Sequence, residues 1–311
     1  METLVSDAAT QAGVRRPDFM IIGAMKSGTT TLYRYLGRHS RIFMCYPKEP
    51  MFFSRQYSKG LDWYFSLFSG ADENQVCGEA STCYSRWPYF GNVAARIREA
   101  VPDSKFIYVM RHPVERAYSH YRHEMEERQS PGGGNVISFE QALDEFPEIF
   151  QTGLYRLQIG KFLELFPRDR LLPMFFEDLT KNPGPVLEEV QRFLGLEPES
   201  RVLESEIVAN PFGSRTVTRE TRAIKNSIHR TPVVSAILNR IPPRARASIR
   251  AGLKLPFSLL NLATRHRVRS LEQQLAPLEG VVRRQLLERY AGANRELEEI
   301  MARPVPSDWH V

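Results

Sequence analysis

The feature that most constrains the fold is a short apolar run that leads into a glycine-framed loop and then a helix. Residues 18–23 read Asp-Phe-Met-Ile-Ile-Gly, which is typical of a buried strand. The loop of residues 24–31 follows, and then Leu32, Tyr35 and Leu36 recur at helical spacing. A glycine turn between a strand and a helix directs backbone N–H groups and the positive end of the helix toward one point. The segment therefore predicts an anion-binding site.

The order of strand and then helix recurs along the chain. Two further apolar runs, 105–110 and 171–176, are strand-like. Helical periodicity is found in four segments around them: 91–100, 138–150, 154–166 and 183–196. Alternating strands and helices favour the α/β class, with a doubly wound parallel sheet similar to a P-loop fold and flanked by helices.

The first loop differs from the nucleotide-binding pattern GxxxxGK[ST] at one position. That pattern needs a lysine directly after the second glycine, where this chain has Thr29, and the lysine of this loop, Lys26, precedes Gly28. In this arrangement the loop holds a phosphate while Lys26 points at the group bonded to it. A magnesium-dependent kinase and an ordinary turn with a surface lysine are the alternatives.

A second pair of residues points to another anion. Arg111 follows the strand-like run 105–110, and Ser119 comes eight residues later on a helix that begins at Pro113. Both side chains are expected at the carboxyl edge of the sheet, where they can face one phosphate. Together with the first loop, they predict a nucleotide that is phosphorylated at two separated positions.

These motifs resemble those of the sulfotransferases that use 3′-phosphoadenosine 5′-phosphosulfate (PAPS). Residues 19–32 are similar to the family's 5′-phosphosulfate loop, and residues 108–119 are similar to its 3′-phosphate motif. Shorter similarities support these two: they lie at residues 47–53, 60–64, 78–82, 153–155 and 306–309. The resemblance is to bacterial sulfotransferases and to the sulfotransferase domains that act on heparan-type sugars.

The resemblance implies PAPS as the co-substrate and adenosine 3′,5′-bisphosphate (PAP) as the product. It implies in-line displacement, in which Lys26 neutralises the negative charge that builds on the bridging oxygen of the nucleotide. No metal is expected, since the lysine supplies the charge. The residues expected to bind the nucleotide are Lys26, Ser27, Gly28, Thr29, Thr30, Thr31, Arg111, Ser119 and Arg215.

The resemblance also places the base that accepts the acceptor's proton at Glu49. This carboxylate is followed by Pro50 and lies near the aromatic pair 52–53, so it is expected to be partly shielded from water. A solvated loop carboxylate is the alternative. Three residues are expected to contact the acceptor: Lys48, Glu79 and Tyr155, for which a core position is the alternative. The second-choice bases are Glu79, His112, His120 and His123, and a helix-surface role is the alternative for the three histidines.

The acceptor is expected to be a hydroxyl or amine of a carbohydrate, a glycolipid or a small molecule. Sugar-sulfating relatives often carry a histidine two residues after the glutamate and a lysine after a later glutamate. This chain has Met51 and Ala80 at those places, so a heparan-like acceptor is not implied.

The basic character of the chain is confined to one segment. The net charge is +6, yet residues 221–271 contain eleven Lys or Arg and no acid. Removing those eleven from the 42 basic residues leaves 31 against 36 acidic ones. Apolar stretches alternate with the arginines, which is typical of basic amphipathic helices. Three uses compete: a helical cap over the acceptor cleft, attachment to an anionic membrane surface, and a solvated face.

Nucleic acid is not expected as a partner, because no recognition motif accompanies this charge. The three cysteines form no CxxC pair, and no apolar run reaches 18 residues. A cytoplasmic enzyme, peripheral to the membrane if the basic segment binds lipid, is therefore predicted. A non-catalytic protein of the membrane surface is the alternative from another class. Four parts are expected: a flexible arm (1–17), a PAPS-binding core (18–220), a basic helical cap or insertion (221–271) and a C-terminal helix packed on the core (272–311).

Overall fold

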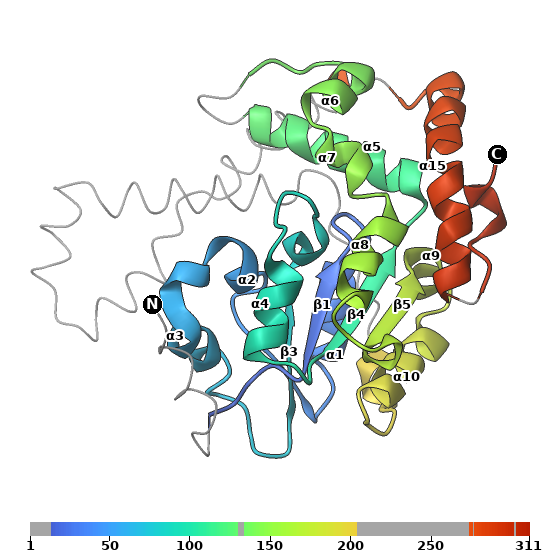
Figure 1. The fold of residues 1–311 in the computed structure, drawn as a ribbon. Coiled ribbons are helices and arrows are strands. Elements are labelled where there is room, and N and C mark those ends of the chain that lie inside the picture. Colours follow the sequence, from blue (N-terminus) through green and yellow to red (C-terminus); the bar gives the residue numbers. More distant parts are fainter. Residues whose placement is uncertain (1–13, 130–133, 204–273, 276, 302) are drawn as a thin grey trace, which may run out of the picture. The chain divides into compact units, whose positions relative to one another are not determined.

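The computed structural model describes residues 14–129, 134–203, 274–275, 277–301 and 303–311 (Figure 1). Within them, five strands form a sheet in the order β2-β3-β1-β4-β5, and each neighbouring pair is parallel. The strands are β1 (Phe19–Gly23), β2 (Ile42–Met44), β3 (Val76–Ala80), β4 (Lys105–Met110) and β5 (Leu171–Phe175). The predicted α/β class with a parallel sheet is confirmed.

Alternate residues of β1 face opposite sides of the sheet. Phe19 and Ile21 join one hydrophobic cluster, and Met20 and Ile22 join the other. All four side chains are fully buried, because helices cover a parallel sheet on both faces. This burial on both faces explains why the strand reads as an uninterrupted apolar run.

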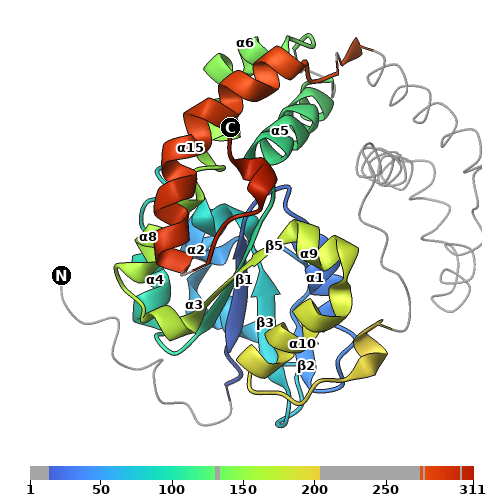
Figure 2. The same ribbon diagram turned by 90° about the vertical axis from the view of Figure 1, so that its right-hand side faces the viewer.

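Helices lie on both sides of the sheet, as Figure 2 shows. On one side are α1 (Thr29–Leu36), α9 (Phe176–Lys181) and α10 (Pro183–Phe193). On the other are α2 (Phe52–Arg55), α3 (Gly60–Ser66), α4 (Val93–Ala100), α8 (Tyr155–Leu163) and α15 (Gly280–Met301). The remaining α-helices described are α5 (Pro113–Arg128), α6 (Phe139–Glu145) and α7 (Glu148–Gln151). Short 3-10 turns lie at Tyr57–Lys59, Thr82–Ser85, Arg168–Arg170, Ser200–Leu203 and Ser307–Trp309.

The C-terminal helix α15 packs along α8. Leu297 and Met301 belong to the same buried cluster as Ile159 of α8. Tyr290 stacks on Phe150 with 4.5 Å between ring centroids, and its hydroxyl donates to the Phe150 carbonyl oxygen at 2.9 Å. A helix is therefore present within residues 272–311, as the sequence predicts.

Two strands and one helix break were not predicted. β2 has three residues, and β3 carries Gly78 and Glu79 inside a five-residue strand, so neither gives an apolar run of the usual length. The predicted helix over 138–150 is divided into α6 and α7 at Pro147, whose ring removes a backbone donor.

The chain divides into two compact units. The first consists of residues 1–121, 139–209 and 278–311 and contains the whole sheet. The second consists of residues 122–138 and 210–277, and in its described part Arg128 Nε donates to the Asn135 carbonyl oxygen at 3.1 Å. Arg215 and the basic segment 221–271 lie outside the described residues.

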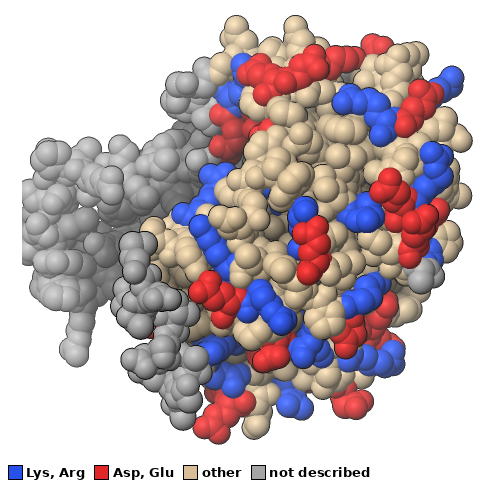
Figure 3. Space-filling view, in the orientation of Figure 1, with Lys and Arg blue, Asp and Glu red and all other residues tan. Residues whose placement is uncertain are grey.

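The described end of the expected N-terminal arm contacts the core. Arg15 donates to the Glu73 carbonyl oxygen at 3.3 Å, and the Arg16 guanidinium lies 5.1 Å from the ring centroid of Phe65. Figure 3 shows Lys and Arg interspersed with Asp and Glu over the described surface of one face, in line with the near balance of charge outside the basic segment. None of the described helices combines the length and the apolar character that crossing a membrane requires.

Candidate functional site

The loop between β1 and α1 turns through two residues of left-handed conformation. Lys26 has φ of 69° and Gly28 has φ of 81°. At the start of the loop, the amide of Ala24 donates to the Val109 carbonyl oxygen of β4 at 2.7 Å. A Cβ atom at Gly28 would lie 2.5 Å from the ring of Phe176, so the conformation and the packing both require glycine there. The loop is thus held between β4 and α9.

The first turn of α1 presents backbone amides beside this loop. Gly28 is the residue that precedes the helix, and its carbonyl oxygen accepts from the Thr31 amide at 2.9 Å. Within the described part of the chain, no side chain caps this end and no acid lies in its first turn, so none of those residues neutralises its positive end. Thr29 and Thr31 are buried and Thr30 is half-buried. The buried Ser27 hydroxyl makes no hydrogen bond to any residue that the structure describes, which fits a loop built to hold an anionic group.

Arg111 follows β4 and reaches the loop. Its Nη1 donates to the Lys26 carbonyl oxygen at 3.4 Å, and its guanidinium carbon lies 5.1 Å from the ring centroid of Phe176. Its backbone is held by Tyr155, whose hydroxyl donates to the Arg111 carbonyl oxygen at 2.6 Å. Ser119 lies further along α5 and is half-buried. The two predicted anion-binding motifs therefore adjoin at Lys26 and Arg111.

The end of the chain holds the residue next to Arg111, a contact that the sequence did not reveal. The His112 amide donates to Glu177 Oε1 at 2.8 Å, and its Nε2 donates to the Asp308 carbonyl oxygen at 2.9 Å. Trp309 is fully buried, with its ring centroid 5.6 Å from that of Tyr155. In the sequence, the similarity of residues 306–309 to the sulfotransferases is the one sign that this stretch contributes to the site.

Glu49 lies at the same edge of the sheet as the loop. Its amide donates to the Ala80 carbonyl oxygen at 2.9 Å, and Ala80 is the register partner of Ile21 on β1. Lys48 Nζ lies 2.8 Å from Glu49 Oε1, and these side chains are 17% and 19% exposed. Thr82 Oγ1 donates to the other carboxylate oxygen at 3.4 Å. The carboxylate is thus partly shielded and paired with a lysine.

Glu79 is completely buried under this segment. Its Oε1 accepts from the hydroxyls of Tyr64 at 2.6 Å and Tyr84 at 2.8 Å, and its Oε2 accepts from Ser81 at 2.7 Å. Burial raises the pKa of Glu79, because desolvation disfavours the charged form and the nearby Glu49 charge acts in the same direction, while the three hydroxyls oppose the shift without cancelling it. From its sequence, this side chain is expected to contact the acceptor, whereas its three hydrogen-bond partners in the structure are hydroxyls of the protein itself.

Tyr155, also expected to contact the acceptor, lies in the core. It is 1% exposed, packs against Trp309 and Tyr108, and orients Arg111 through its hydroxyl. Burial raises its pKa, so the hydroxyl keeps its proton for that hydrogen bond.

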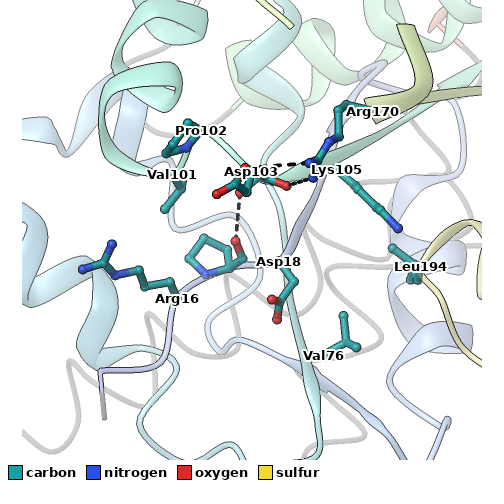
Figure 4. A pocket seen from close by; sticks show the side chains of 11 residues that line it. Arg16, Asp18, Val76, Val101, Pro102, Asp103, Lys105, Arg170 and Leu194 are labelled. Atoms are coloured by element: carbon teal, nitrogen blue, oxygen red, sulfur yellow. Dashed lines mark hydrogen bonds and ion pairs between the residues drawn. The ribbon is translucent and has the colours of Figure 1, made fainter. Parts of the chain in front are cut away.

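A cavity of about 440 Å³ lies at the opposite, amino edge of the sheet (Figure 4). Asp18, Lys105 and Arg170 are among its lining residues. Lys105 Nζ donates to the Phe193 carbonyl oxygen at 2.6 Å, and Arg170 pairs with Asp103 at 3.7 Å. These charges contact the protein, and the cavity is separate from the Lys26 loop. Among the described residues, no three His, Cys, Asp or Glu side chains are grouped as metal ligands would be.

The chain is similar to proteins of one family. The family model for the sulfotransferase domain matches residues 16–213. Heparan sulfate glucosamine 3-O-sulfotransferase 3A1 of Mus musculus is 33% identical over 184 residues, which are 58% of this chain and 46% of that protein. Bifunctional heparan sulfate N-deacetylase/N-sulfotransferase 2 of Homo sapiens is 29% identical over 205 residues, which are 59% of this chain and 22% of that protein. The chain spans about half of the length of the first of these relatives and less than a quarter of the length of the second.

A solved structure shares the fold. The crystal structure of a sulfotransferase from Alicyclobacillus acidocaldarius matches with a TM-score of 0.62 at 24% identity, over 95% of this chain and 99% of that one.

Proposed function

Since this chain belongs to the sulfotransferase domain family, we propose that it transfers a sulfuryl group from PAPS to a hydroxyl or amine of an acceptor. The observation that supports this most is the position of three charged residues at the ends of neighbouring strands. Lys26 follows β1 and Arg111 follows β4. The Glu49 amide donates a hydrogen bond to the carbonyl oxygen of Ala80, the last residue of β3. Since β3, β1 and β4 are adjacent and parallel, all three residues belong to one edge of the sheet.

The loop and the first turn of α1 bind the 5′-phosphosulfate in this proposal. The amides of residues 28–30 and the hydroxyls of Thr29 and Thr30 position the group, since the amides of Ser27 and Thr31 donate to Ala24 and Gly28 within the loop. The positive end of the helix favours the charge of the bound group. Lys26 offsets the negative charge that develops on the bridging oxygen as the sulfur–oxygen bond breaks. PAPS itself supplies the sulfuryl group, and PAP leaves as the product.

The 3′-phosphate is assigned to Arg111 and Ser119, with Arg215 as a further contact from outside the described residues. Arg111 is oriented by Tyr155 and lies over Phe176, so its guanidinium is held in place before the nucleotide binds. A planar guanidinium can donate two parallel hydrogen bonds to a phosphate, which makes this residue the principal contact.

Glu49 is the proposed base. It removes the proton of the acceptor hydroxyl or amine as that atom attacks the sulfur, and its partial burial keeps bulk water from the carboxylate. Lys48 Nζ lies 2.8 Å from Glu49 Oε1 and holds that carboxylate, and we propose that Lys48 contacts the acceptor or the sulfonate when they bind. In this proposal Glu79 and Tyr155 act indirectly, as supports for Glu49 and Arg111.

A carbohydrate is the proposed acceptor. The two relatives named above act, by their names, on heparan sulfate or its glucosamine. Met51 and Ala80 replace residue types that sugar-sulfating relatives often carry, so the proposal extends to the class of sugar hydroxyls and amines and not to heparan sulfate itself.

The test is incubation with sulfur-35-labelled PAPS and three probes: a glucosamine-containing oligosaccharide, a glycolipid and a phenol. Label is expected on the oligosaccharide, with and without a magnesium chelator. Lys26→Ala and Glu49→Gln are expected to lower kcat at least a hundredfold, and Glu49→Gln should keep the wild-type affinity for PAP. Phosphate transfer from magnesium ATP without any sulfuryl transfer would favour the kinase alternative.

A further inference from the structure

Two of the three hydroxyls on Glu79 also hold the backbone next to Glu49. Ser81 Oγ accepts from the Met51 amide at 3.0 Å, and the Tyr84 hydroxyl oxygen accepts from the Phe53 amide at 3.3 Å. An amide can only donate, so each hydroxyl must direct its own hydrogen elsewhere, and each directs it to the Glu79 carboxylate. Glu79 thereby fixes the orientation of both hydroxyls.

The segment held in this way has an unusual backbone. Glu49 has φ of 60° and Met51 has φ of 53°, which is left-handed conformation at residues other than glycine. Such conformations persist where the surroundings impose them. Three hydrogen bonds donated by the segment's own amides contribute here: the Glu49 amide to Ala80, the Met51 amide to Ser81 and the Phe53 amide to Tyr84. Two of the three depend on the Glu79 carboxylate.

Tyr64 provides an internal comparison. Its hydroxyl donates to the same Oε1 atom at 2.6 Å, and it is as fully buried as Tyr84, which is 2% exposed. Its ring stacks on Phe52 with 4.4 Å between centroids. Among the hydrogen bonds described, its hydroxyl has the Glu79 carboxylate as its partner and holds no backbone amide.

We propose that Glu79 is a positioning residue for the base: through Ser81 and Tyr84 it locks the left-handed segment 49–53, and so fixes where the Glu49 carboxylate points. The proposal rests on the proposed function, in which Glu49 takes the acceptor's proton. Glu79 does not touch either substrate in this role.

The test compares Tyr84→Phe with Tyr64→Phe. Each variant removes one buried phenolic hydroxyl from Glu79 Oε1, and Tyr84→Phe alone leaves a backbone amide without its acceptor. The first measurement is amide hydrogen exchange at Met51 and Phe53, followed by NMR. Exchange at Phe53 is expected to rise about tenfold or more in Tyr84→Phe and to stay within twofold of wild type in Tyr64→Phe. Glu79→Gln is expected to raise exchange at both amides.

The second measurement is turnover with labelled PAPS and the oligosaccharide probe. Tyr84→Phe is expected to lose about tenfold in kcat with an unchanged KM for PAPS, whereas Tyr64→Phe keeps wild-type kcat. Equal losses in the two variants, or faster exchange at Phe53 without a loss of kcat, would overturn the proposal. If Tyr84→Phe does not fold, Ser81→Ala with exchange at Met51 takes its place.

The two proposals fail in different ways. A wild-type protein that transfers no sulfuryl group to any of the three probes and binds no PAP contradicts the proposed function. Amide exchange needs no substrate, so unchanged exchange in Tyr84→Phe, Ser81→Ala and Glu79→Gln contradicts the Glu79 lock alone.

Discussion

The Nη1 atom of Arg111 donates a hydrogen bond to the carbonyl oxygen of Lys26, over 3.4 Å. The two residues are 85 positions apart in the chain, and each belongs to a different motif that the sequence predicts to bind an anion. Phe176 lies beneath both motifs, against Gly28 and under the Arg111 guanidinium. The motif expected to bind the 3′-phosphate therefore also supports the loop expected to bind the 5′-phosphosulfate.

Arg111→Ala should lower the affinity for PAP. Loss of a charge-assisted contact costs about 1.5 to 3 kcal/mol, so titration calorimetry should show a Kd about 10- to 150-fold higher. Adenosine 5′-phosphate, which lacks the 3′-phosphate, should bind the wild type more weakly than PAP does, and Arg111→Ala should lower its affinity less than it lowers the affinity for PAP, because only the support of the Lys26 loop is lost. Arg170→Ala, at the opposite edge of the sheet, is the matched control and should bind PAP like the wild type. Equal wild-type affinity for the two nucleotides would refute the assignment of Arg111.

Gly28→Ala should destabilise the fold and abolish PAP binding. An L-residue at φ of 81° costs about 1–2 kcal/mol, and the added Cβ would lie 2.5 Å from Phe176, which adds about 1–3 kcal/mol of overpacking. Thermal and urea unfolding measure the sum. Gly195→Ala is the control, because Gly195 has φ of 82° and no heavy atom within 4 Å of its Cβ position. Gly195→Ala should lose only the part of the unfolding free energy that comes from the backbone conformation, about 1–2 kcal/mol, and it should keep PAP binding. Similar losses of stability in both variants would mean that the Phe176 ring shifts to make room for the new methyl group.

The local pattern of the sequence predicts the parts of the site that are continuous in the chain. The apolar strand, the glycine loop and the helix of residues 18–36 are adjacent, so residue spacing alone indicates the anion-binding turn. The proximity of Arg111 follows from one further rule, that parallel strands end at a common edge. Both inferences need no knowledge of side-chain packing.

Contacts between distant segments could not be predicted in the same way. Glu79 looks like an acid available to a substrate, because nothing in its own strand shows that Tyr64 and Tyr84 surround it. The contact of Asp308 with His112 joins positions 196 residues apart. Packing of this kind depends on how loops return to the sheet, and a single sequence carries no periodic signal for that.

Glu79 should make the stability of the protein depend on pH. Burial raises its pKa above the value of 4.5 expected in the unfolded chain, so between these two values the folded state binds more protons than the unfolded state. The free energy of unfolding should then fall as pH rises from about 4.5 through the raised pKa. Glu79→Gln removes this titration, so its urea-unfolding free energy should decline less over that range than the wild-type value. Parallel pH profiles for the two proteins would show that burial does not raise the pKa of Glu79.

The basic segment 221–271, which lies outside the described residues, contains neither of the phosphate motifs. We therefore expect it to govern contact with the acceptor or with an anionic membrane and not the binding of PAPS. Arg244, Arg246 and Arg250 are to be replaced together by Gln. Each arginine near an anionic lipid surface contributes about 1 kcal/mol to the free energy of membrane binding. Salt ions screen the attraction between exposed charges more than about 8–10 Å apart, so the binding of wild-type protein to phosphatidylserine vesicles should weaken steeply as salt is added.

The triple variant separates the three uses of the segment. Loss of vesicle sedimentation with an unchanged KM for the acceptor assigns the arginines to the membrane. A higher acceptor KM without any vesicle binding by the wild type assigns them to a cap over the acceptor. PAP affinity should equal the wild-type value in both cases, because Lys26 and Arg111 are untouched. Unchanged vesicle binding and unchanged acceptor kinetics would leave only a solvated face, whose charge keeps the protein soluble.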